Sequence, residues 1–136
     1  MEKNKIIVKT ESGNYPIIIG RNLISNLSKI LAKNSIKFEK CLLVIDNCLQ
    51  KRMVTKIIKS LKNKNINKFY FKASEKNKSQ KSVDKIIDIL LSKNFSRKDC
   101  LITIGGGITG DVGGYASSIF KRGMQFINIP TTLLSQ

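Results

Sequence analysis

Strand-like apolar runs alternate with helix-periodic segments along most of this chain, and that alternation limits the folds it can adopt. The apolar runs lie at residues 41–45, 66–71, 101–104 and 126–129. Apolar residues recur at helical spacing over residues 23–31, 49–61 and 83–91, and either Ser79 or Ser82 can cap the third of these helices. Because parallel strands need crossover helices, this order predicts one α/β domain over residues 1–136, with a parallel sheet flanked by helices.

The N-terminal segment follows a different pattern. Residues 5–10 and 15–19 are rich in apolar residues and flank the turn-forming tetrapeptide 11–14. Two such runs around a short turn are typical of antiparallel strands. The sequence therefore predicts an N-terminal β-hairpin ahead of the parallel sheet.

The charge balance is strongly basic, with 25 Lys and Arg against 9 Asp and Glu, a formal charge of +16, and no His. Without His, the chain has no imidazole for general base catalysis, for a nucleophile system or for a zinc site. Only four of the basic residues are Arg, which is the residue that most often reads nucleic acids, and the Lys are scattered through helix-like stretches. We therefore expect a compositional bias and no nucleic-acid partner, with a basic RNA-binding module as the alternative.

The three cysteines, Cys41, Cys48 and Cys100, form neither CxxC nor a zinc spacing. An odd, unpatterned count indicates a reducing compartment. We expect no signal peptide in the first residues, and no apolar stretch reaches the roughly 18 residues that a membrane span requires. We expect a cytoplasmic protein without a membrane partner.

Glycines are concentrated directly after the run 101–104, in the segment Gly105-Gly106-Gly107-Ile108-Thr109-Gly110-Asp111-Val112-Gly113-Gly114. Backbone N–H groups of such a segment can approach a phosphate, and a helix that begins near Gly107 directs its positive end at the same point. The spacing fits GxGxxG, but the acid expected about 20 residues later is missing, and the candidate ribose acid, Asp46, precedes the segment. A P-loop would need Lys where Asp111 stands, and Asp111 would repel a phosphate at close range. Tight helix–strand packing without a ligand is the alternative.

Two motifs resemble the 3-dehydroquinate synthase family. The glycine segment, extended to Tyr115, matches GGG-x-x-GD-x-x-G[FY], and residues 121–136, KRGMQFINIPTTLLSQ, match RG-x-x-F-x-x-[VI]PTTLL[AS]Q. Residues 15–20, Asp46 and the pair Glu75-x-x-Lys78 extend the resemblance over nearly the whole chain. The resemblance implies a Rossmann-like fold, NAD as cofactor, and conversion of the sugar phosphate 3-deoxy-D-arabino-heptulosonate 7-phosphate to 3-dehydroquinate and phosphate in the shikimate pathway. It also implies a homodimer.

The resemblance assigns roles residue by residue. Asp46 with Glu75 and Lys78 would hold the adenosine end of NAD, and Thr131 and Thr132 would add hydroxyl and backbone contacts. The diphosphate and its neighbouring ribose would be wrapped by Gly106, Gly107, Ile108, Thr109, Gly110 and Asp111. Arg122 resembles the arginine that reaches the substrate phosphate from the neighbouring subunit. Each role has a structural alternative: a solvated Glu75–Lys78 pair, a strand-end turn at Asp46, or a helix N-cap at Thr131 and Thr132.

The chain departs from the family pattern in small details and in extent. Ser74 stands where the family usually has Gly, and Asn47 lies one place early for the family's D-x-N. In the family, the motif ending at Gln136 continues into an all-helical domain that carries the metal ligands. We therefore expect the zinc or cobalt site to lie outside these 136 residues and the chain alone to be inactive. A related sugar-phosphate cyclase or a polyol dehydrogenase is the nearer alternative.

Overall fold

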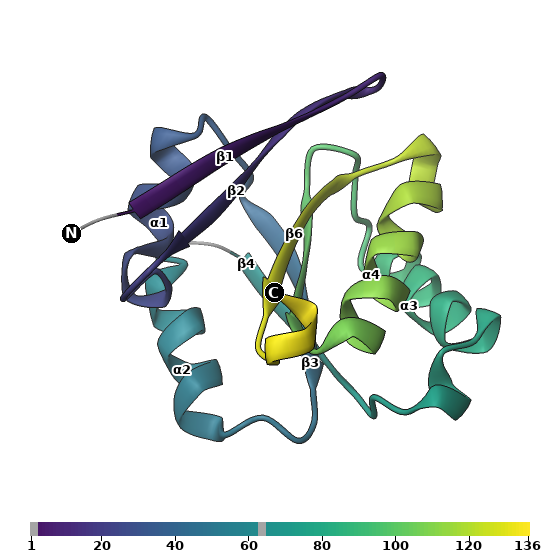
Figure 1. The fold of residues 1–136 in the computed structure, drawn as a ribbon. Coiled ribbons are helices and arrows are strands. Elements are labelled where there is room, and N and C mark those ends of the chain that lie inside the picture. Colours follow the sequence, from purple (N-terminus) through teal and green to yellow (C-terminus); the bar gives the residue numbers. More distant parts are fainter. Residues whose placement is uncertain (1–2, 63–64) are drawn as a thin grey trace.

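Four parallel strands form the central sheet, in the order β4-β3-β5-β6 (Figure 1). The computed structural model describes residues 3–62 and 65–136. The strands are β3 (Lys40–Asp46), β4 (Asn65–Phe71), β5 (Cys100–Gly105) and β6 (Gln125–Pro130). The α-helices are α1 (Leu27–Lys33), α2 (Lys51–Ser60), α3 (Gln80–Ser92) and α4 (Gly107–Ile119). Short 3₁₀ turns are η1 (Ile24–Asn26), η2 (Glu75–Asn77), η3 (Phe120–Arg122) and η4 (Leu133–Ser135).

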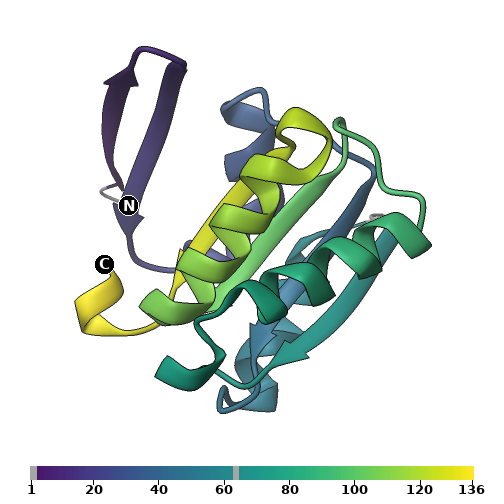
Figure 2. The same cartoon turned by 90° about the vertical axis from the view of Figure 1, so that its right-hand side faces the viewer.

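The predicted hairpin is present as β1 (Lys3–Thr10) and β2 (Gly13–Gly20), which pair antiparallel with Ile6 opposite Ile17. It forms a separate two-stranded sheet, and Figure 2 shows it standing to one side of the parallel sheet. The expected α/β order with an N-terminal hairpin is thus confirmed.

Apolar side chains fill both faces of the sheet, which explains the continuous apolar runs of β3 and β5. On one face Leu43 and Ile102 pack with α1 and α2, and on the other Leu42 and Leu101 pack with α3 and α4. All six residues of β5 are buried. Figure 2 shows α3 and α4 lying side by side over their face of the sheet. The core therefore holds the carboxyl ends of β3 and β5 in fixed positions.

Helix boundaries follow local capping chemistry. The first stripe, predicted over residues 23–31, begins as the 3₁₀ turn η1 and becomes α-helical only at Leu27. Of the two serines that could cap α3, Ser79 does so, because its Oγ accepts a hydrogen bond from the Ser82 N–H at 3.4 Å. Among the described residues no helix has the length and apolar character needed to cross a membrane.

The strand order creates a switch point between β3 and β5. From β3 the chain crosses to β4 on one side, and it then returns through α3 to β5 on the other side. The segments that follow β3 and β5 lead to helices on opposite faces, α2 and α4. In open α/β sheets, the crevice at the carboxyl ends of two such strands is where ligands bind.

Close approach of α4 to β5 depends on Gly113. A Cβ at this position would lie 2.1 Å from Cγ2 of the fully buried Thr103. We expect Gly113→Ala to lower the free energy of unfolding by about 3 kcal/mol, because neither the helix nor the strand can move away cheaply.

The matched control is Gly107→Ala in the same helix, where a Cβ meets nothing within 4 Å. We expect this variant to keep or gain stability, by up to about 1 kcal/mol, because Ala favours helix more than Gly does. Urea denaturation of both variants measures the difference. Equal effects of the two substitutions would contradict the packing assigned to Gly113.

Candidate functional site

The ends of β3 and β5 touch at the switch point. Asp46 is the last residue of β3, and a Cβ built on Gly105, the last residue of β5, would lie 3.0 Å from the Asp46 Cβ. The same Cβ would lie 2.8 Å from the hydroxyl oxygen of Thr109 in α4. Gly105 is therefore the point at which β3, β5 and α4 meet, and it leaves no room for a side chain.

The glycine turn leads into an α-helix whose N-terminus has no side-chain cap. Gly106 is the N-cap of α4, and the first helical hydrogen bond runs from the Gly110 N–H to the Gly106 carbonyl at 3.1 Å. Gly107 is exposed, with open space where a Cβ would stand. The free N–H groups and the helix dipole of this turn form a site suited to an anion.

The segment after β6 closes against the same turn. The Thr131 N–H donates to the Gly105 carbonyl at 2.9 Å, and a Cβ on Gly106 would come within 3.2 Å of the Thr132 methyl group. Thr132 also caps the η4 turn, where its hydroxyl lies 2.8 Å from the Ser135 hydroxyl. The capping role considered for Thr132 is therefore real, and it also fixes Thr131 and Thr132 beside the glycine turn.

Thr109 carries an unusual hydroxyl. Its side chain is fully buried, and within the described part of the chain its Oγ1 has no hydrogen-bond partner. A buried hydroxyl without a partner costs free energy. It lies against Gly105 in the first turn of α4, directly beneath the glycine turn. The residues at this turn thus fit an oxygen-rich anionic group such as a diphosphate.

Asp46 stabilises the turn after β3, and part of its carboxylate is still exposed. Its Oδ1 accepts a hydrogen bond from the Cys48 N–H at 2.9 Å, and the Asn47 N–H donates to the Phe71 carbonyl at 2.9 Å. These bonds fix the turn after β3 and link it to the end of β4. The strand-end turn considered for Asp46 is present, and the carboxylate remains half-exposed at the switch point, where ribose hydroxyls could donate to it.

Lys78 and Asp111 form an ion pair of 2.8 Å, the one salt bridge within the described residues. The hydrogen bond and charge of Asp111, with a smaller contribution from Glu75, raise the pKa of Lys78 above its ordinary value. Both side chains are well exposed, at 47% for Lys78 and 62% for Asp111. Glu75 and Lys78 are close enough for charge coupling, but the direct partner of Lys78 is Asp111, a pairing that the sequence did not suggest.

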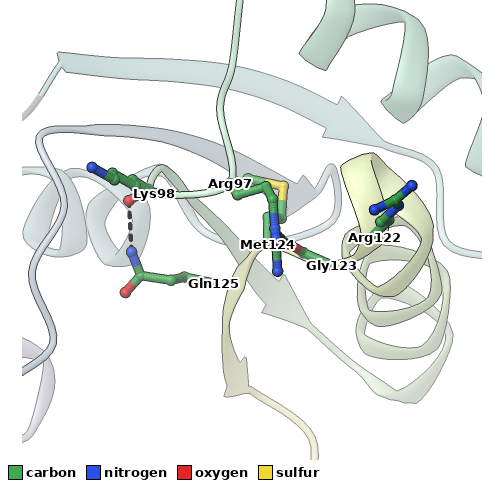
Figure 3. Close-up of a pocket in the computed structure, with 6 residues that line it drawn as sticks. All are labelled: Arg97, Lys98, Arg122, Gly123, Met124 and Gln125. Atoms are coloured by element: carbon green, nitrogen blue, oxygen red, sulfur yellow. Dashed lines mark hydrogen bonds between the residues drawn. The ribbon is translucent and has the colours of Figure 1, made fainter.

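Arg122 lies away from these residues, at the opposite end of β6. It precedes Gln125, where β6 begins, whereas the glycine turn lies beside the other end of that strand, six residues or about 20 Å further on. Arg122 lines an open hollow of about 600 Å³ together with Arg97 and Lys98. Figure 3 shows these side chains. The structure therefore does not bring Arg122 together with the other predicted site residues of the same chain.

The backbone around Arg122 is strained. Lys121, Arg122 and Gly123 have positive φ angles of 45°, 67° and 105°. Side chains hold this turn: Lys121 Nζ donates to the Phe95 carbonyl at 2.8 Å, and Arg97 Nε donates to the Gly123 carbonyl at 3.2 Å. Two consecutive residues other than glycine in this conformation are costly, and such strain is concentrated at functional sites.

Asn128 is a residue of the site region that the sequence reasoning missed. The buried Thr103 hydroxyl donates to Asn128 Oδ1 at 2.8 Å, and a Cβ on Gly110 would lie 3.1 Å from that oxygen. Asn128 thus braces the first turn of α4 from β6. The alternation of β6, in which Ile127 and Ile129 pack into the other face, is the signal that could have placed it there.

The parallel α/β sheet, its switch point and the glycine turn define a Rossmann-like domain. The family model described as 3-dehydroquinate synthase N-terminal matches residues 68–136, just over half of the chain. The chain belongs to the 3-dehydroquinate synthase family.

Curated relatives agree with this assignment. The 3-dehydroquinate synthase of Pelagibacter ubique is 57% identical over 132 residues, which are 97% of this chain and 36% of the relative. That of a Prochlorococcus marinus strain is 37% identical over 99% of this chain and 38% of the relative. The chain thus spans little more than a third of the length of these relatives.

Solved structures share the fold. A 2-deoxy-scyllo-inosose synthase superposes with a TM-score of 0.87 at 19% identity, over 97% of this chain and 37% of that one. A 2-deoxy-scyllo-inosose synthase complexed with carbaglucose-6-phosphate, NAD+ and Co2+ superposes with a TM-score of 0.86, over 97% of this chain and 36% of that one, also at 19% identity. The Rossmann-like fold expected from the sequence is confirmed. Residues 3–62 and 65–136 contain no group of three or more His, Cys, Asp and Glu placed to hold a metal ion.

The Thr109 hydroxyl provides a test of the site. We expect Thr109→Val to raise the free energy of unfolding by about 1 kcal/mol, because the substitution removes a buried polar atom that has no partner. Denaturation without added ligand measures this gain. The control is Thr103→Val, which removes a buried hydroxyl that does have a partner, Asn128, and should cost about 1 kcal/mol. A loss of stability in Thr109→Val would show that its hydroxyl is already satisfied.

Proposed function

We propose that this chain is the NAD-binding domain of a 3-dehydroquinate synthase, and that it extends over residues 1–136. The observation that carries the proposal is the helix N-terminus at Gly106 and Gly107, without a side-chain cap and open at the switch point, with the buried and unpartnered Thr109 hydroxyl beneath it. A diphosphate suits the open helix end, because it supplies negative charge for the helix dipole and oxygen atoms for the N–H donors.

The proposed site spreads the dinucleotide over segments at the carboxyl ends of all four parallel strands. Asp46 would accept hydrogen bonds from the ribose hydroxyls of the adenosine half, near Glu75 and Lys78. The diphosphate and the second ribose would lie along the glycine turn and the start of α4, against Gly106, Gly107, Ile108, Thr109, Gly110 and Asp111. Thr131 and Thr132 would close the site from β6, where the Thr131–Gly105 hydrogen bond already holds them.

In this proposal the full enzyme converts 3-deoxy-D-arabino-heptulosonate 7-phosphate to 3-dehydroquinate and phosphate. NAD, when bound, supplies a reversible hydride acceptor, and a zinc or cobalt ion polarises a substrate oxygen. The residues of this chain bind and orient the dinucleotide, and the contact between α4 and β5 fixes where its reactive end lies. Support comes from the synthases of 57% and 37% identity, and from the NAD+ and Co2+ bound to the synthase of the same fold.

The place of Arg122 supports a homodimer. Its guanidinium lies at the amino end of β6, too far from the glycine turn to act on a ligand bound there in the same chain. A second copy could present its Arg122 to that ligand, where a planar guanidinium suits a phosphate group. The odd, unpatterned cysteine count supports a cytoplasmic enzyme.

NAD binding tests the cofactor site. We expect isothermal titration to show NAD binding to the chain, and Asp46→Asn to weaken it about tenfold, because a ribose hydroxyl loses a charged acceptor. NADP should bind more weakly than NAD to the unchanged chain, since its 2′-phosphate would meet the Asp46 carboxylate. The control Asp88→Asn removes the same charge from an exposed position on α3 and should leave the affinity unchanged. Equal losses in both variants would argue against a ribose contact at Asp46.

The reaction is tested in a chimera. This chain replaces the matching 36% of the Pelagibacter ubique synthase, and phosphate release from the heptulosonate phosphate is measured with NAD and a divalent metal. We expect activity within about tenfold of the unmodified synthase, and a loss of at least about a hundredfold on Arg122→Ala, which removes a charged partner of the phosphate. A chimera that binds NAD yet releases no phosphate would contradict the proposed reaction and leave the cofactor site standing.

A further inference from the structure

The Lys78–Asp111 ion pair joins two segments that follow different strands. Lys78 ends the η2 turn after β4, and Asp111 lies in α4 after β5. In the sheet, β3 lies between β4 and β5. The pair therefore connects the segments on either side of the switch point, within the site proposed for the dinucleotide.

Helix geometry directs Asp111 toward the open end of α4. Gly107 and Asp111 are four residues apart, so they lie on one face of the helix, and side chains in a helix lean toward its N-terminus. Gly107 has no side chain to intervene, and the space beside it is open. The Asp111 carboxylate thus faces the same region as the free N–H groups of the first turn.

This placement creates an electrostatic conflict. A bound diphosphate would lie close to the Asp111 carboxylate, and like charges at such a distance repel each other. The ammonium group of Lys78, 2.8 Å from Asp111 Oδ2, cancels that charge and adds three N–H donors at the same place. Asp111 in turn holds the flexible Lys78 side chain beside α4, which lowers the entropy cost of a contact between Lys78 and a phosphate bound at that helix end.

We propose that Lys78 and Asp111 act as one unit in dinucleotide binding. Asp111 is a positioning residue that holds the Lys78 side chain. Lys78 neutralises the Asp111 carboxylate, so that this helix end can bind a diphosphate. The inference rests on the proposed function. It differs from the reading in which each residue contacts NAD independently, because independent contacts give losses of affinity that multiply.

A double-mutant cycle separates the two possibilities. NAD affinity is measured by isothermal titration for the unchanged chain, Lys78→Gln, Asp111→Asn and the double variant. We expect a loss of at least about tenfold in Lys78→Gln, where the carboxylate is left unpaired, and of no more than about threefold in Asp111→Asn. The double variant should bind NAD more tightly than Lys78→Gln, because the second substitution removes the repulsion.

The matched control is Lys76→Gln, which removes one positive charge from the exposed η2 turn and should change affinity less than twofold. In 1 M NaCl, where charges are screened beyond about 3 Å, the loss in Lys78→Gln should shrink. Circular dichroism checks that each variant is folded. We expect all of them to fold, because the Lys78 and Asp111 side chains are both exposed.

Each outcome has a distinct meaning. Recovery of affinity in the double variant supports the coupled pair. A double variant that binds as weakly as Lys78→Gln, or more weakly, overturns it while leaving NAD binding in place. Failure of the unchanged chain to bind NAD overturns both this inference and the proposed cofactor site.

Discussion

Glycines let α4 lie directly on β5 and β6, and the arrangement of the site depends on that close approach. A Cβ at Gly113 would lie 2.1 Å from the Thr103 side chain, and one at Gly110 would lie 3.1 Å from Asn128. Because interiors are close-packed, a helix pushed outward by even one methyl group would lose contacts along its length. The contact therefore fixes the helix axis, and with it the point at which the positive end of α4 meets the ends of β3 and β5.

That fixed helix end explains the polar groups around it. The first turn of α4 offers N–H groups without a side-chain cap, the Thr109 hydroxyl beneath it has no partner among the described residues, and Asp111 stands one turn further along. Taken alone, Asp111 argues against an anion at this place. Paired with Lys78 it does not, since the pair carries no net charge and keeps an ammonium group at Asp111. The electrostatics of the site are thus a property of two segments brought together by the sheet.

The two ends of β6 lie in different surroundings. Thr131 and Thr132 close on the glycine turn at one end, whereas Arg122 lies in the strained turn at the other. A fold retained at 19% identity with a 2-deoxy-scyllo-inosose synthase shows that the sheet order tolerates extensive sequence change. Few parts of the chain fix the geometry of the site. They are the glycines at the contact of α4 with the sheet, the strand ends at Asp46 and Gly105, and the segment after β6.

The sequence alone determined the element order, the parallel sheet, the hairpin and the location of the glycine turn, because side-chain periodicity and glycine content report local burial and backbone freedom directly. Motif resemblance added the family and named the residues that gather at the switch point, apart from Arg122. It could not reveal the Lys78–Asp111 pair, the brace of Asn128 on Thr103, or the missing partner of Thr109. Only the tertiary structure decided those, because each depends on the distance between side chains on segments that the packing of the sheet and its helices brings together.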